Sequence, residues 1–155
     1  MKKVMLAVAV VATLVATQSC KKKKTTDTAT TAVAPTASIS GTLNAEIDFT
    51  NTKIDKAAGA TVYLIIDTKD LALNPSSTIT YASTVLKTTT DGNGKFTFAN
   101  FAIGQKPMNV EIRIGDFETT RTLSATQTDV HVFKANSAMV NVFATGAFIQ
   151  DFTLN

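Results

Sequence analysis

Residues 88–98 read Thr-Thr-Thr-Asp-Gly-Asn-Gly-Lys-Phe-Thr-Phe, and the expected fold follows from this stretch. The threonines and the alternating Lys-Phe-Thr-Phe run are typical of strands. Between them stand Asp91, Gly92, Asn93 and Gly94, residues that tolerate positive φ and favour a tight turn. The stretch therefore predicts two antiparallel strands joined as a hairpin.

The segment before it that starts at Ser38 alternates between apolar and polar residues. One face carries Ile39, Gly41, Leu43, Ala45, Ile47 and Phe49. A period of two predicts a half-buried antiparallel strand. Gly41 inside it indicates either a bulge or the close approach of another backbone. A polar loop is expected over residues 50–56.

Further strand-like segments follow, separated by turn signals. The nearly continuous apolarity of residues 61–66 predicts a central strand covered on both faces. A loop with a short helical turn at Leu71 and Leu73 is expected over 67–75. Other expected strands are 78–90, 108–114, 117–123, 128–134 and 138–154, the last broken at Gly146. Because no sustained helical period occurs after residue 36, the sequence predicts an all-β, antiparallel sandwich of about seven or eight strands.

Five short motifs occur in a recognisable order along these segments. They are Ile-Ser-Gly-Thr at 39–42, Gly-Ala-Thr-Val-Tyr-Leu at 59–64, Thr-Asp-Gly-Asn-Gly-Lys-Phe-Thr-Phe at 90–98, Ile-Gly at 103–104 and Val-Glu-Ile at 110–112. Together they resemble the carboxypeptidase regulatory-like domain, a transthyretin-like, immunoglobulin-type sandwich. In two places the sequence departs from that family: residues 50–58 replace a short Gly-Pro-Leu turn, and Lys106-Pro107 replaces an aromatic residue. The resemblance implies a non-catalytic accessory domain.

The N-terminus has the organisation of an export signal. Two lysines precede an uncharged apolar run at 4–16 and a small polar step at 17–19, and the only cysteine, Cys20, is followed by four lysines. This pattern resembles the signal peptide and lipobox of a bacterial lipoprotein, although Thr17 replaces the usual leucine. The resemblance implies that Cys20 becomes the N-terminus and carries acyl chains such as palmitate. A plain cleaved signal and an uncleaved anchor are the alternatives, but the apolar run is shorter than the roughly 20 residues of a membrane-spanning helix.

The predicted lipoprotein signal and the predicted sandwich divide the chain into three parts. They are a signal helix at 1–19, a lipidated and disordered tether at 20–36 and a sandwich at 37–155. The sixteen residues 21–36 hold no aromatic side chain and are expected to stay disordered, with an average span of roughly 20 to 25 Å. Within them Asp27-Thr28-Ala29 resembles an O-glycosylation acceptor, with Thr28 as the modified residue. The alternative is a solubilising threonine tract. The lysines differ from the acid-rich signals of surface lipoproteins, which favours the periplasmic side of the outer membrane over surface exposure.

The positive charge of the chain has a local origin. The formal net charge is +3, yet residues 37–155 hold nine Lys and Arg against eleven Asp and Glu, a net of −2. Such a domain has no electrostatic footprint for nucleic acid. The expected partners are a membrane, through the lipid on Cys20, and an unidentified envelope protein or glycan.

Few residues are candidates for a metal site or for catalysis. Asp91 and Asn93 could open a calcium loop, but Lys95 occupies the next ligand position. His131 is the only histidine and has no second ligand for a zinc site. No catalytic residue, metal or cofactor is therefore expected. The first hypothesis is a non-catalytic interaction module that uses the loops 50–60 and 68–77; the alternatives are a lipoprotein that binds carbohydrate or a small apolar ligand, and an envelope enzyme of unrecognised type.

Overall fold

The computed structural model describes residues 34–155. In this part of the chain it contains eleven strands and one short helix, α1 (Thr68–Leu71), which confirms the all-β prediction. The expected signal helix, the lipidation site Cys20 and the glycosylation site Thr28 lie outside the described residues.

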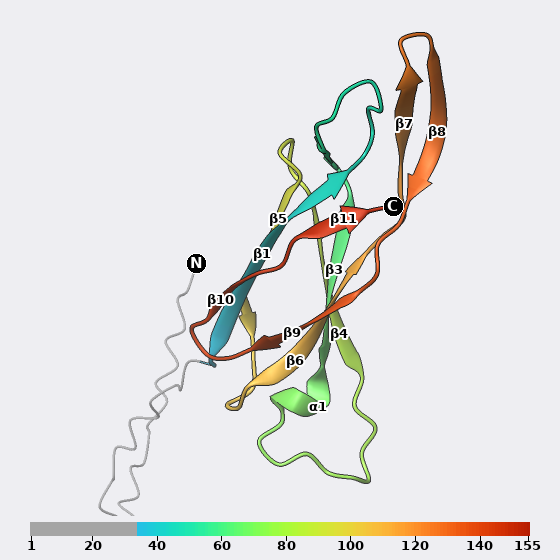
Figure 1. Cartoon of the computed structure of the whole chain (residues 1–155). Helices are drawn as coiled ribbons and strands as arrows, with labels where there is room; N and C mark the ends of the chain where they lie inside the picture. Colours follow the sequence, from blue (N-terminus) through green and yellow to red (C-terminus); the bar gives the residue numbers. More distant parts are fainter. Residues whose placement is uncertain (1–33) are drawn as a thin grey trace, which may run out of the picture. The chain divides into compact units, whose positions relative to one another are not determined.

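The first sheet is built around β1 (Thr36–Ala45). This strand pairs antiparallel with β5 (Lys95–Ala102) and β2 (Asp55–Lys56). It pairs parallel with β10 (Ala147–Ile149) and β11 (Phe152–Leu154). The parallel pairs differ from the purely antiparallel expectation, because the chain crosses over from the second sheet and then runs alongside β1 in the same direction (Figure 1).

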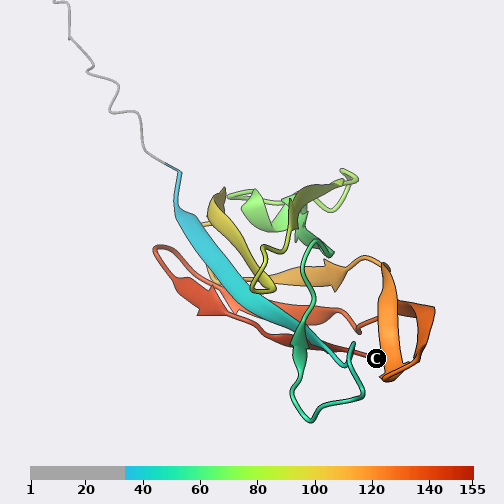
Figure 2. The ribbon, with the colours of Figure 1, turned by 90° about the horizontal axis from the view of Figure 1, so that it is seen from above.

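The second sheet is antiparallel, with the order β4-β3-β6-β9. Its strands are β4 (Ser83–Thr89), β3 (Thr61–Asp67), β6 (Met108–Ile114) and β9 (Ala138–Val142). Alternate residues of β1, β3 and β6 are buried between the two sheets, which lie as two layers in Figure 2. The largest fully buried side chains are Phe96, Ile39, Leu43, Leu64, Ile112, Leu154, Val62, Val110 and Val142. This core needs no metal or disulfide to explain it, because a domain of this size can bury enough apolar surface.

A hairpin of β7 (Phe117–Ser124) and β8 (Gln127–Phe133) forms a separate sheet and projects from one end of the molecule (Figure 1). Backbone contacts hold it both near its tip, at Thr122, and just beyond its base, at Lys134. Thr122 exchanges hydrogen bonds with Ile47 and Phe49, at 2.8 and 2.9 Å, and Lys134 exchanges two with Asn155, both at 2.9 Å. The hairpin and the segment 47–49 are therefore fixed relative to each other.

Several strand boundaries differ from the sequence prediction. The strand expected as far as Phe49 ends at Ala45. Beyond it the backbone N–H groups of Ile47 and Asp48 donate to the Asp55 carboxylate instead of to a neighbouring strand. Strand β4 begins at Ser83 instead of residue 78. The expected strand 138–154 is divided into β9, β10 and β11. Strand β3 is central, but only one of its faces is fully buried, since Tyr63 and Ile65 on the other are half-buried.

The expected hairpin at residues 88–98 is wrong in one respect. Asp91–Gly94 do form a turn, closed by a 2.9 Å bond from the Gly94 N–H to the Asp91 carbonyl. The strands on either side, however, belong to different sheets, since β4 pairs with β3 and β5 pairs with β1. Buried Thr90 marks the crossover: its hydroxyl donates to the Ala57 carbonyl and accepts the Ala60 N–H. The turn therefore connects the two layers of the sandwich.

Candidate functional site

The structure has two hollows, and each borders one of the loops that the sequence predicted as contact surfaces. Helix α1, beside one of them, and the β7–β8 hairpin, beside the other, lie at opposite ends of the sandwich (Figure 1). One lies beside α1 and the loop after it, and we call it the proximal hollow. The name refers to the start of the described chain, which lies close by. The Pro35 carbonyl accepts the N–H of Ile103, and Gln105, two residues further on, lines this hollow. The other is lined by residues of the β7–β8 hairpin, of the loop after β1 and of the C-terminal end of the chain, and we call it the distal hollow.

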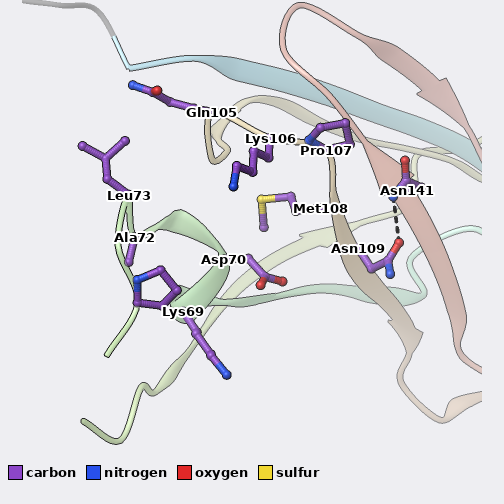
Figure 3. Close-up of a pocket in the computed structure, with 11 residues that line it drawn as sticks. Lys69, Asp70, Ala72, Leu73, Gln105, Lys106, Pro107, Met108, Asn109 and Asn141 are labelled. Atoms are coloured by element: carbon purple, nitrogen blue, oxygen red, sulfur yellow. Dashed lines mark hydrogen bonds between the residues drawn. The ribbon is translucent and has the colours of Figure 1, made fainter. Parts of the chain in front are cut away.

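The proximal hollow has a volume of about 360 Å³ and a mostly polar wall (Figure 3). Helix α1 supplies Lys69 and Asp70, and the helix begins where the Asp67 carboxylate accepts the Lys69 N–H at 2.9 Å. On the opposite wall Asn141 donates to Asn109 at 2.9 Å. The hollow contains one carboxylate and no aromatic side chain among its lining residues. This arrangement can form hydrogen bonds, and Lys69, Asp70 and Lys106 give it charged groups of both signs.

The distal hollow is larger, about 440 Å³, and mixes apolar and polar walls. Buried Phe133 and Leu154 line its interior. Phe49 and Ile54 remain 43% and 61% exposed at its edge. The polar lining residues are Glu46, Arg121, His131, Thr153 and Asn155. Small-molecule binding sites combine apolar and aromatic side chains with a few polar groups that orient the ligand, and this hollow contains both kinds of group.

Arg121 is held in the distal hollow by contacts with Asp129 and Phe49. Its Nε and Nη2 donate to the two carboxylate oxygens of Asp129 across the hairpin, at 3.1 and 2.7 Å. This hydrogen-bonded pair lowers the pKa of Asp129 and raises the pKa of Arg121. The guanidinium carbon lies 5.2 Å from the centre of the Phe49 ring, within the range of a cation–π contact. Two bonds and one ring contact therefore fix its position.

His131, which the sequence analysis considered as a metal ligand, shares the distal hollow with Glu46, whereas Glu111 and Glu118 lie elsewhere. His131 lines the distal hollow and packs edge-on against Phe133, with ring centres 4.6 Å apart. Glu46 lines the same hollow, whereas Glu111 pairs with Arg113 on the outer face of the second sheet and Glu118 is exposed on β7. Within residues 34–155 no three His, Cys, Asp or Glu side chains gather as metal ligands.

Hydrogen bonds of the Asp91 side chain account for the conformation of the turn at 91–94. One carboxylate oxygen of Asp91 accepts the backbone N–H groups of Asn93 and Lys95, at 2.8 and 2.9 Å. These bonds, that from Lys95 first, lower the pKa of Asp91. A carboxylate used in this way stabilises the turn itself.

This carboxylate gives the fold a predicted acid sensitivity. A group whose pKa is lower in the folded than in the unfolded chain stabilises the fold above its unfolded pKa, about 3.9 for Asp, and this contribution is lost as the pH falls through the folded pKa. We therefore expect the melting temperature to decrease when the pH is lowered below about 4. The decrease should be smaller in Asp91→Asn, because an asparagine side chain has no carboxylate to protonate. Melting curves at neutral and acid pH measure this, with Glu118→Gln on exposed β7 as the control. An equal fall in Asp91→Asn and wild type would contradict the prediction.

Sequence reasoning did not find the pairing of Phe49 with Arg121. Phe49 was expected on the buried face of a strand, and Arg121 lies far away in the sequence, on the projecting hairpin. Only the bridge between residues 47–49 and Thr122 brings them together. No local pattern contains that information.

No helix within residues 34–155 is long and apolar enough to cross a membrane.

Comparisons with known proteins add evidence about the fold. No family model matches the chain, and no curated protein matches it either. Among solved structures, the chain is similar to a protein from Pseudomonas aeruginosa that is provisionally named a carbohydrate-binding protein. The TM-score is 0.50 at 17% identity, over 77% of this chain and 89% of that one. At this identity the likeness supports the fold alone.

A second match, the major plantain pollen allergen Pla l 1, covers 76% of this chain and 93% of that one at 13% identity. Its TM-score of 0.34 is too low to carry an argument. The lipoprotein and carboxypeptidase regulatory-like resemblances stay predictions.

Proposed function

We propose that this protein is a lipid-anchored, non-catalytic binding module of the bacterial cell envelope. Acyl chains on Cys20 hold it at the outer membrane, facing the periplasm, with surface exposure as the alternative. The sandwich serves as the binding part, and the residues between Cys20 and β1 serve as the tether.

The observation that carries this proposal is the position of the distal hollow relative to the start of the described chain. Strand β1 begins at Thr36, beside Ala102 and the wall of the proximal hollow. It runs to Ala45, which pairs with Leu154 in the wall of the distal hollow. A sandwich tethered before residue 34 can therefore present the distal hollow to partners away from the anchor.

Replacing Cys20 tests the anchor. Cys20→Ala is expected to release the protein into the aqueous phase or leave it unprocessed, because stable anchoring takes at least two membrane signals. Detergent phase partitioning of membranes from cells that produce the two forms measures this. If Cys20→Ala partitions into detergent as wild type does, the proposed lipid anchor is wrong. Ser19→Ala, at the neighbouring position, is the control.

Carbohydrate binding is the second candidate function. It is supported by the fold-level likeness to the provisionally named carbohydrate-binding protein and by the mixed lining of the distal hollow. The lack of tryptophan argues for a weak and shallow site, since Phe49 is the only exposed aromatic ring in that lining.

A further inference from the structure

We propose that the distal hollow binds a neutral pyranose ring of a glycan, with the Phe49 ring as the stacking surface and Arg121 as the main hydrogen-bond donor. This inference rests on the proposed binding function and names the ligand class and the residues of that site.

The apolar edge of the hollow is the first observation. Phe49 and Ile54 are large apolar side chains that remain 43% and 61% exposed on the same rim. Leaving such side chains in water forgoes the burial energy that a fold normally gains from them. The C–H bonds on one face of a pyranose carry partial positive charge and suit the negative face of an aromatic ring. A sugar ring would therefore cover this edge.

Arg121 supplies the second observation, unused donors in a fixed position. A guanidinium has five N–H donors, and the contacts with Asp129 use Nε and one N–H of Nη2. The remaining three can donate to hydroxyl oxygens. The Glu46 carboxylate can accept a hydrogen bond from a hydroxyl, and the His131 ring can donate or accept one. Ring hydroxyls, which both donate and accept, match this mixed set.

The charge balance selects a neutral sugar. Arg121 and Asp129 cancel each other through their bidentate pair, and Glu46 then leaves a negative charge on the rim. A uronate or sialate would meet this charge without a free cation among the lining residues. The volume of about 440 Å³ lies within the roughly 300 to 1,000 Å³ of small-molecule sites, so the hollow has room for a sugar unit.

Rigidity of the rim is the third observation. The bonds of Thr122 with Ile47 and Phe49 place the backbone of Phe49 against the hairpin, and the contact with Arg121 positions its ring. A ring held in place before binding loses little freedom on binding, which favours recognition of a weakly held ligand such as a sugar.

The test is a titration of the purified full chain, in detergent, with short neutral oligosaccharides of glucose, galactose, mannose and N-acetylglucosamine, and with oligogalacturonate as the anionic comparison. We expect binding to at least one neutral series. Phe49→Ala should weaken it by about tenfold or more, and Phe49→Tyr, which keeps the ring, should stay within about twofold of wild type. Asn109→Ala, in the proximal hollow, is the matched control and should leave affinity unchanged.

The variants separate the possible outcomes. Each is first checked by its melting midpoint, and if Phe49→Ala fails to fold, Ile54→Ala on the same rim replaces it with the same expected direction. No binding of any neutral series, tighter binding of oligogalacturonate, or equal affinity in wild type and the rim variants would overturn the proposal. Cys20→Ala should bind as wild type does, so loss of the anchor and loss of the glycan site are distinguishable.

Discussion

Gly41→Val is expected to leave most of the chain unfolded at room temperature. Gly41 lies in the middle of β1, between the two sheets, and a Cβ atom there would overlap the Gln150 carbonyl oxygen and lie 2.7 Å from the Phe96 ring. Neither neighbour can move freely, because Gln150 donates to Ser40 at 2.9 Å and Phe96 is buried. We expect a loss above about 4 kcal/mol, an exceptional value for one substitution, from a total stability of about 5 to 15 kcal/mol.

Thermal and denaturant unfolding of the full chain measure this loss. The matched control is Ser40→Val, the preceding residue, whose half-buried side chain points to the other face of β1. The control should cost little, since β-branched residues suit strands. A melting midpoint for Gly41→Val within a few degrees of wild type would mean that residues 150–151 do not run against β1.

Gly94→Val is expected to lower the free energy of unfolding by about 3 kcal/mol. This loss is somewhat smaller than the one expected for Gly41→Val. Gly94 has a φ of 69°, a conformation that a β-branched residue adopts only under strain. Its added Cβ would also lie 2.5 Å from the Leu43 carbonyl oxygen. Since Leu43 donates to the Gly94 carbonyl at 2.8 Å, the turn cannot move away without losing its bond to β1.

Gly92 provides the control for this prediction within the same turn. A Cβ at Gly92 would meet no atom within 4 Å, so Gly92→Val should cost much less than Gly94→Val. Denaturant midpoints of the two variants make the comparison. Equal costs would show that the strain at Gly94 is not what the turn depends on.

The sequence predicted the strands well where a strand's own pattern determines its burial. The alternation from Ile39 to Ala45 reproduces the observed buried face of β1, and the strand predicted at 108–114 is β6. Of the two alternatives for Gly41, the close backbone approach is confirmed. The irregularity in the pairing of β1 with β5 lies instead between Ala37 and Ile39.

Pairing between distant segments could not be read from local patterns. The turn at Asp91–Gly94 has the residues of a hairpin, yet the bonds of Thr90 and Leu43 send its two flanks into different sheets. The same reason applies to the distal hollow. Its lining residues come from the loop after β1, from the projecting hairpin and from the end of β11, which only tertiary contacts bring together.

The intact mass of the protein extracted from the membranes of bacteria that produce it tests the proposed lipid anchor most directly. The account predicts the mass of residues 20–155 increased by acyl chains, with the added mass located on Cys20 after fragmentation. A mass that corresponds to the complete chain, or to a cleaved chain without acyl groups, would contradict it.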